Sequence, residues 1–219
     1  MTEIECEAVL FDCDGVLVDS RASILASWTS WADRRGLDRS LVLGTIDGPN
    51  MIEIIRQVAP HLVAEEEAVE LRAWEVAHAE GTAAIPGSTL VRGLPRDRWA
   101  VVTSGNAPVI QARLRAASLP MPDVLVTAED VRAGKPSPDG YLMASEKIGV
   151  APDRCMVFED APAGVAAALR AGMRVVALAT THEPSQLDEA DACVPDMRSI
   201  SVIVTNRGLR VHVRNGSRQ

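Results

Sequence analysis

Residues 8–16 read AVLFDCDGV, a run of four apolar side chains that leads directly into two acids and a glycine. A short run that is apolar on both faces is typical of a strand buried inside a parallel sheet. Side chains alternate along a strand, so Asp12 and Asp14 can face the same way where the strand ends. Two close carboxylates repel each other, and a bound cation best explains such a pair. The stretch therefore predicts a buried strand that delivers two acids to a site.

The second half of the chain repeats this alternation of strand and helix. Apolar runs occur at 99–103, 124–127, 155–158 and 174–178, and helical patterns separate them at 108–117, 140–148 and 161–171. Such alternation implies parallel strands joined by right-handed crossovers. The sequence therefore predicts an α/β fold with a Rossmann-like parallel sheet. At the end of the chain, residues 200–213 predict a β-hairpin with a purely structural role.

Residues 18–82 depart from this rhythm, because they contain no convincing strand. Helical patterns occur at 23–34, 51–58 and 62–79, and the last of these predicts an apolar face made of Val69, Ala73, Val76 and Ala77. An all-helical block after the first strand predicts a small inserted cap. We therefore assign residues 1–17 and 83–219 to the core and 18–82 to the cap, with glycines in the return linker, residues 81–87, acting as a hinge.

Composition narrows the classes of function. The 219 residues suffice for one domain with a modest insert, and 47% of them are hydrophobic. The net charge of −8 disfavours a nucleic-acid partner, which needs clustered basic residues. No apolar run is long enough to span a membrane, and the first residues lack the basic region of a signal peptide. The four cysteines lack zinc-like spacing and are expected to be reduced packing residues. We therefore expect a cytoplasmic protein without a membrane or nucleic-acid partner.

Three further polar clusters follow predicted strands. They are Thr103-Ser104-Gly105-Asn106, the Lys135 loop in GKPSPDG, and Glu159-Asp160. Taken singly, each has a plain alternative: a turn with a helix cap, a solvated surface lysine, and an N-cap acid. The carboxyl ends of parallel strands meet at one edge of a sheet, so these clusters can join Asp12 and Asp14. Carboxylates, a hydroxyl and a lysine together form the set that phosphoryl transfer needs.

These stretches resemble the four signature motifs of the haloacid dehalogenase superfamily, in the same order. The matching segments are FDCDGVLVDS, VVTSGNA, GKPSPDGY and VFEDAPAGVAAALRAGM, and the resemblance covers nearly the whole chain. SWTSWADRRGL and EGTAAIPG in the first half are similar to bacterial phosphatases that act on hexose and polyol phosphates.

The resemblance implies a role for each matching position. Asp12 is expected to be the nucleophile, and Asp14 the acid that protonates the leaving oxygen and later activates water. Mg²⁺ is expected on Asp12, the backbone carbonyl of Asp14, and Asp160, with Glu159 as a further ligand or as a hydrogen-bond acceptor beside the metal. Ser104 and Lys135 are expected to bind the phosphoryl oxygens, together with the backbone around Gly105 and Asn106. The expected substrate is a small phosphate monoester, hydrolysed through an aspartyl-phosphate.

Three alternatives stay open. Related sugar-phosphate mutases carry a basic residue in the first cap loop, whereas here that loop, residues 45–50, reads TIDGPN, which favours hydrolysis. Dehalogenases need neither the second acid nor magnesium, so Asp14 and Glu159-Asp160 argue against one. A catalytically idle binding module could lose Asp12 or Lys135 without penalty, and both are present.

Overall fold

The computed structural model describes residues 2–46 and 51–214. Its centre is a six-stranded parallel sheet in the order β6-β5-β2-β7-β8-β9. The strands are β2 (Ala8–Phe11), β5 (Trp99–Val102), β6 (Val124–Val126), β7 (Cys155–Glu159), β8 (Arg174–Leu178) and β9 (Ala192–Val194). The Rossmann-like α/β fold predicted from the sequence is therefore confirmed. Of the six strands in this sheet, β9 alone was missed, because it is a three-residue edge strand preceded by acidic residues.

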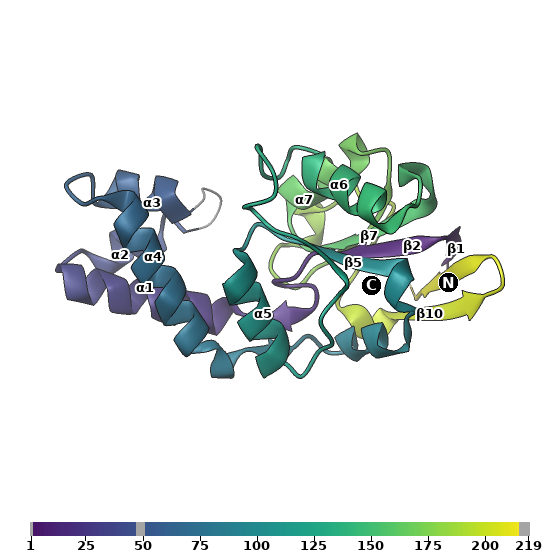
Figure 1. Ribbon diagram of the computed structural model, residues 1–219, viewed down its shortest axis with the longest axis horizontal. Helices are drawn as coiled ribbons and strands as arrows, with labels where there is room; N and C mark the ends of the chain where they lie inside the picture. The colour runs from purple at the N-terminus through teal and green to yellow at the C-terminus, as the bar shows by residue number, and fades with distance from the viewer. Residues whose placement is uncertain (1, 47–50, 215–219) are drawn as a thin grey trace.

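Helices cover both faces of this sheet (Figure 1). On one face lie α6 (Asp139–Ile148) and α7 (Pro162–Arg170), and on the other lies α5 (Ala107–Ala116). Within β2, Val9 and Phe11 pack into the cluster that contains α5, whereas Ala8 and Leu10 pack into the cluster that contains α6 and α7. Both sets are fully buried, which explains why the strand is apolar throughout.

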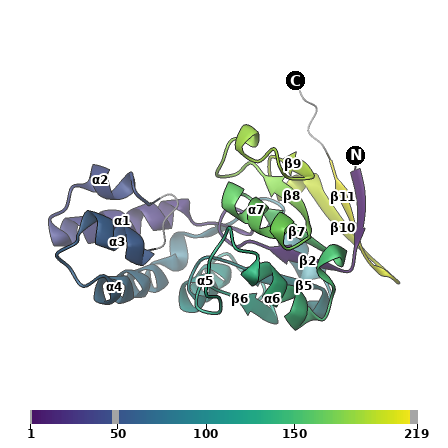
Figure 2. The same cartoon turned by 90° about the horizontal axis from the view of Figure 1, so that it is seen from above.

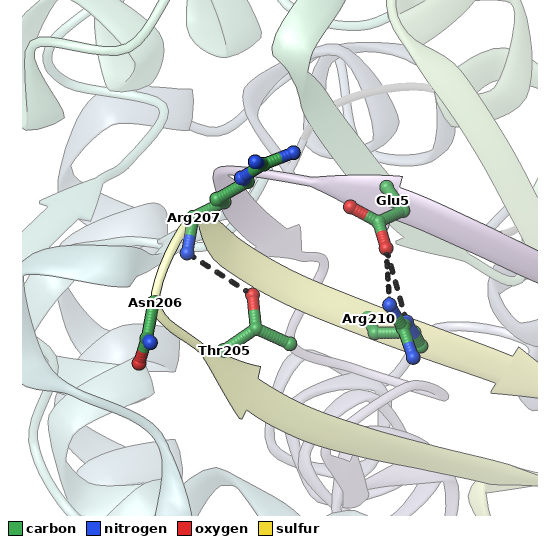
Figure 3. A pocket seen from close by; sticks show the side chains of 5 residues that line it. All are labelled: Glu5, Thr205, Asn206, Arg207 and Arg210. Atoms are coloured by element: carbon green, nitrogen blue, oxygen red, sulfur yellow. Dashed lines mark hydrogen bonds and ion pairs between the residues drawn. The ribbon is translucent and has the colours of Figure 1, made fainter.

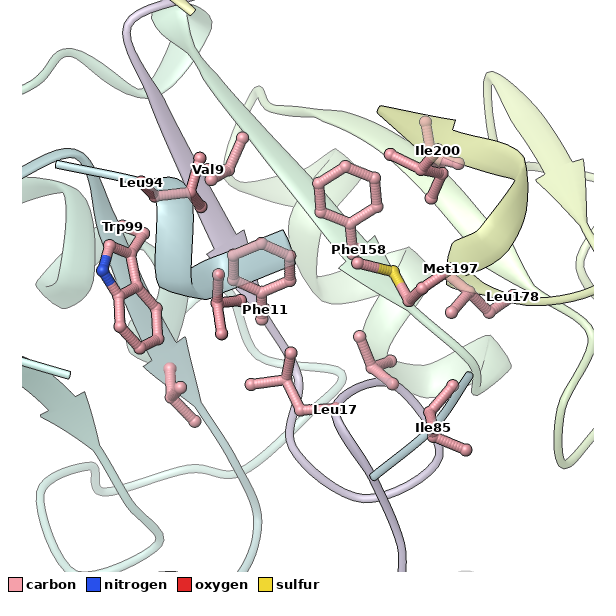
Figure 4. Close-up of a cluster of buried hydrophobic side chains, with 14 of the residues drawn as sticks. Val9, Phe11, Leu17, Ile85, Leu94, Trp99, Phe158, Leu178, Met197 and Ile200 are labelled. Carbon is pink, nitrogen blue, oxygen red and sulfur yellow. The ribbon is translucent and has the colours of Figure 1, made fainter. Parts of the chain in front are cut away.

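An aromatic pair aligns the two central strands directly before their acids (Figure 4). Phe11 of β2 and Phe158 of β7 stack with ring centroids 5.1 Å apart, and Trp99 of β5 meets Phe11 edge-on at 6.2 Å. Asp12 and Glu159 are the next residues along the two strands. Each such ring pair contributes about 0.5–1.5 kcal/mol beyond the buried area. The stacking of Phe11 on Phe158 thus helps to place Asp12 and Glu159 side by side.

A second, antiparallel sheet packs against the same hydrophobic cluster as α5. It consists of β10 (Ile200–Thr205) and β11 (Gly208–Val213), the predicted hairpin, with β1 (Thr2–Cys6) added along β11. The sequence analysis missed β1, whose acidic TEIEC stretch alternates exposed residues with buried Ile4 and Cys6. All four cysteines are free, and three of them are buried.

Four helices form a separate bundle beside the sheet (Figures 1 and 2). The α1–α4 bundle comprises α1 (Arg21–Arg35), α2 (Arg39–Leu43), α3 (Met51–Val58) and α4 (Ala64–Ala77), and it has an apolar core of its own that includes Trp28 and Trp31. The helix α2 was not predicted; its N-terminus is capped by Asp38, whose carboxylate accepts hydrogen bonds from the backbone N–H groups of Ser40 and Leu41. The described residues 18–46 and 51–82 are therefore mainly helical, as expected.

The predicted apolar face of α4 is wrong. Val69 and Val76 are 63% and 40% exposed, whereas Glu67 and Glu75 are buried. Glu67 accepts a 2.7 Å hydrogen bond from the indole of Trp31 and pairs with Arg35 at 2.9 Å. Buried carboxylates are tolerated when they have such partners. The face of α4 that turns inward therefore carries these two paired acids together with the buried apolar residues Ala64, Ala68 and Leu71.

The connections between bundle and core also differ from expectation. Contrary to the absence of strands predicted for residues 18–82, β3 (Val18–Asp19) pairs with β4 (Ala83–Ala84), which joins the outgoing and returning segments. Gly87 has a φ of +91°, and a Cβ there would lie 2.4 Å from the backbone of Met197 and Arg198. Close packing against the core therefore accounts for this glycine.

Among the described residues, no helix combines the length and apolar character needed to cross a bilayer.

Candidate active site

The polar clusters singled out in the sequence gather at the carboxyl edge of the parallel sheet. Asp12 follows β2, Thr103-Ser104 follows β5, and Glu159-Asp160 ends and follows β7. Lys135 reaches this edge from the loop before α6, where its ammonium donates to the carbonyl oxygen of Val102 at 3.2 Å. Neighbouring parallel strands bring these residues together although Asp12 lies more than 90 positions before the others.

The centre of the cluster is the pairing of Lys135 with two buried acids. Its Nζ lies 2.5 Å from Asp12 Oδ1 and 2.5 Å from Glu159 Oε1. Burial raises the pKa of Asp12 well above its usual value, and Lys135 acts in the opposite direction. Burial also disfavours the charge on Lys135, but Asp12 and Glu159 outweigh it and raise the pKa of the ammonium. The lysine therefore stays charged beside the carboxylate predicted to be the nucleophile.

Glu159 is held by donors on both of its oxygens. Oε1 accepts hydrogen bonds from Lys135 and from the hydroxyl of Tyr141, the latter at 2.8 Å. Oε2 accepts from the backbone N–H groups of Asp160 at 2.9 Å and Ala161 at 3.1 Å. A Cβ on Gly164 would lie 1.8 Å from Oε1, so only glycine leaves room for this carboxylate. This arrangement suits a residue that positions Lys135 better than one that binds a metal directly.

Asp160 completes a group of three buried acids, of which Asp12 and Asp160 are the two that fit a divalent cation, because both oxygens of Glu159 already accept hydrogen bonds. Carboxylate oxygens of Asp12, Glu159 and Asp160 all lie within 4.8 Å of one another, and the three residues are buried. Burial, reinforced by Glu159, raises the pKa of Asp160 to about 7. Such mutual repulsion is relieved when a cation binds, and an oxygen-only set suits a hard ion such as magnesium. The chemistry of the donors therefore fits the expected metal.

Residues after β8 support Asp160 and were missed in the sequence. The hydroxyl of Thr181 hydrogen-bonds the Asp160 carboxylate, and Nδ1 of His182 lies 3.0 Å from the Asp160 carbonyl oxygen. Thr180 donates to the carbonyl of Gly15 at 2.6 Å. The rule that polar residues after a strand meet at one edge, applied to residues 174–178, would have found this segment.

Asp14 lies beside the central group and faces different partners. Its Oδ1 accepts hydrogen bonds from Ser20 at 2.5 Å and from Arg113 at 2.8 Å. Gly15, next to it, has a φ of +82°, and a Cβ there would collide with Asp160 Oδ2 at 2.1 Å. The turn after Asp12 thus requires glycine and directs Asp14 toward the α1–α4 bundle. No motif in the sequence points to Arg113, which lies in the middle of an amphipathic helix.

The segment Ser104-Gly105-Asn106 is partly engaged within the protein. Ser104 is exposed. The N–H of Gly105 donates to the hydroxyl of Thr103 at 3.1 Å, and the side chain of Asn106 donates to Glu129 at 2.9 Å. Phosphate binding by these residues stays a prediction, with Ser104 the group best placed to meet a ligand from solvent.

A polar hollow of about 410 Å³ elsewhere on the molecule does not belong to this site. It is lined by Glu5, Thr205, Asn206, Arg207 and Arg210 (Figure 3). Arg210 pairs with Glu5 at 2.7 Å, and the turn of the hairpin lies beside Cys6, at the amino end of β2. The acids lie at the opposite, carboxyl end of that strand.

Comparison with known proteins identifies the family. A sequence model described as haloacid dehalogenase-like hydrolase matches residues 6–172. The chain therefore belongs to the haloacid dehalogenase-like hydrolases, and the family predicted from the four motifs is confirmed.

The relatives include enzymes with named activities. Hexitol phosphatase A of Escherichia coli (strain K12) is 39% identical over 212 residues, which cover 91% of this chain and 95% of the relative. Glycerol-1-phosphate phosphohydrolase 2 of Saccharomyces cerevisiae is 32% identical over 214 residues, covering 91% and 86%. Among solved structures, CbbY from Rhodobacter sphaeroides in complex with phosphate has a TM-score of 0.75 at 26% identity, over 88% of this chain and 95% of that one.

Proposed function

We propose that this protein hydrolyses small sugar or polyol phosphates in the presence of Mg²⁺ through an aspartyl-phosphate on Asp12. That it is a phosphoric monoester hydrolase follows from its family and from the named phosphatases among its relatives. The observation that carries the mechanism is the buried Asp12 carboxylate, paired with Lys135 and grouped with Glu159 and Asp160 at one edge of the sheet.

Lys135 and Ser104 bind the phosphoryl group opposite Asp12. The ammonium, held by Glu159 and by the carbonyl of Val102, neutralises charge on the phosphoryl oxygens. Ser104, exposed after β5, donates its hydroxyl to another of them, and the backbone around Gly105 and Asn106 assists. Asp12 attacks phosphorus, which forms the new P–O bond as the bond to the leaving oxygen breaks.

The metal would be held by Asp12, Asp160 and the backbone carbonyl of Asp14. When bound, the ion neutralises the phosphoryl oxygens and the repulsion among the carboxylates. Glu159, with both oxygens occupied by donors, orients Lys135 and the start of α7 instead of binding the ion. Thr181 and His182 hold Asp160 in place.

Asp14 provides the proton for the leaving alkoxide and then takes one from the attacking water. Such acid–base help is worth on the order of 10²–10⁴ in rate. Water attacks the aspartyl-phosphate at phosphorus, releases inorganic phosphate and restores the Asp12 carboxylate.

The α1–α4 bundle acts as a cap in this proposal. Residues 18–82 form the cap and residues 1–17 and 83–219 the core, with the β3–β4 pair as the joint between them. Closure of the cap excludes water from the acyl phosphate and leaves room only for small substrates. The loop expected to distinguish a mutase includes residues 47–50, which lie outside the described residues. The phosphatases among the relatives support hydrolysis over transfer.

A substrate panel tests the proposal. Purified protein is assayed for phosphate release from hexitol, glycerol and hexose phosphates and from a phosphoprotein, each with Mg²⁺ or with EDTA, and Asp12→Asn serves as the blank. We expect metal-dependent release from the small substrates alone. Efficient hydrolysis of the phosphoprotein, or equal release by Asp12→Asn, would contradict the proposal.

A further inference from the structure

One arginine joins the α1–α4 bundle to Asp14. Arg113 lies on α5, the core helix that packs beside α4 (Figure 2), and it is only 4% exposed. A guanidinium buried to this extent needs charged or hydrogen-bonding partners. The sequence motifs do not include it, so its role requires a separate explanation.

Its two partners come from different parts of the molecule. Nη1 donates to Asp14 Oδ1 at 2.8 Å, and Nη2 donates to Glu75 Oε1 at 2.9 Å. Glu75 belongs to α4 and is 5% exposed. One planar group thus fixes two carboxylates relative to each other, which the single charge of a lysine cannot do.

The Nε of Arg113 shows how the side chain is held. Its Nε is buried and has no hydrogen-bond partner among the described residues. The guanidinium is therefore placed through its two terminal nitrogens, one for the acid of the loop and one for the acid of the bundle. Burying a charged guanidinium with an unpaired Nε costs free energy, so filling space in the helix does not explain an arginine at this position.

The other partner of Asp14 also leads to the bundle. Ser20, which donates to Asp14 Oδ1 at 2.5 Å, immediately precedes α1. One hydrogen bond to Asp14 therefore comes from the residue that precedes α1, and the other comes from a core arginine that is itself paired with α4. A shift of the bundle that moves Glu75 or Ser20 alters the direction in which Asp14 points.

We infer that Arg113 is a positioning residue that couples the placement of the α1–α4 bundle, through Glu75, to the orientation of Asp14. The inference rests on the proposed function, because Asp14 matters only as the acid for the leaving group. The coupling ensures that Asp14 is correctly aimed when the bundle is in place over the substrate.

The test compares two leaving groups. An alkyl phosphate such as glycerol phosphate needs its leaving oxygen protonated, whereas p-nitrophenyl phosphate does not. We expect Arg113→Lys and the isosteric Glu75→Gln to lower kcat/KM for glycerol phosphate by about 10–100-fold, the usual scale for residues that orient a functional group. The pre-steady-state burst of p-nitrophenolate should stay near the wild-type rate. Arg115→Met, an exposed arginine on the same helix, is the matched control and should change neither.

A second readout separates positioning from folding. In an Asp14→Asn background, Arg113→Lys should cause no further loss, because a residue that acts through Asp14 then has nothing to orient. A further tenfold loss there, or equal losses with both leaving groups, would overturn the inference while the proposed function stands. If Arg113→Lys does not fold, Glu75→Gln carries both tests. Failure of the wild-type protein to hydrolyse either compound would overturn both proposals.

Discussion

Gly164→Ala is expected to damage the active site although glycine contributes no side chain to it. The added Cβ would lie 1.8 Å from Glu159 Oε1, 2.0 Å from Cδ and 2.4 Å from Oε2. Ordinary contact begins at 3.4 Å, so the carboxylate has to retreat by about 1.6 Å. A movement of this size breaks the hydrogen bonds to Lys135 and Tyr141 and those to the backbone of Asp160 and Ala161.

The loss of stability in Gly164→Ala can be estimated from the hydrogen bonds of Glu159 that break. Hydrogen bonds to a charged group contribute about 1.5–3 kcal/mol each, and some re-form after the shift. We therefore expect the free energy of unfolding to fall by about 3–5 kcal/mol, as when one partner of a buried ion pair is lost. Because Lys135 loses its anchor, kcat should fall by about 100-fold or more, since a misplacement of 1 Å has that effect.

Urea denaturation and phosphate release measure the two effects, with Gly93→Ala as the control. A Cβ on Gly93 meets nothing within 4 Å, so that variant should match the wild-type protein or be slightly more stable. If Gly164→Ala keeps near-normal kcat, Glu159 does not position Lys135 and the reasoning fails.

Three further outcomes are expected. Removal of divalent cations with EDTA should abolish turnover, and added Mg²⁺ should restore it; full activity without metal would contradict the metal's role. Asp12→Asn should be inactive with an unchanged far-ultraviolet circular dichroism spectrum, because an amide cannot form the covalent intermediate. Glu67→Leu should lower the free energy of unfolding by about 1–3 kcal/mol, because Trp31 and Arg35 lose a buried acceptor; an unchanged denaturation midpoint would show that this pair does not stabilise the α1–α4 bundle.

The parts of the fold that sequence predicts well are those set by local pattern. The run 8–11 is apolar on both faces because both faces are buried, and so strand β2 was placed correctly. The same holds for the apolar runs of β5, β7 and β8. Since parallel strands end at one edge, the grouping of Asp12, Lys135, Glu159 and Asp160 also followed from the sequence.

The parts that were missed depend on partners distant in the chain. Strand β1 exists because β11, about 200 residues later, offers it an edge, and its own acidic residues give little local signal. The face of α4 was mispredicted because Glu67 and Glu75 are buried against Trp31 and Arg113. No periodicity in a single helix reveals which of its acids will find a buried partner.

Detection of the covalent intermediate on Asp12 bears on the mechanism as a whole. The protein is quenched in acid during turnover of an alkyl phosphate and is then treated with borohydride. Borohydride reduces an aspartyl-phosphate to homoserine, and peptide mass spectrometry locates the homoserine in the sequence. We expect homoserine at residue 12, formed only when substrate and Mg²⁺ are both present. Reduction at another residue, or none during sustained turnover, would contradict nucleophilic catalysis by Asp12.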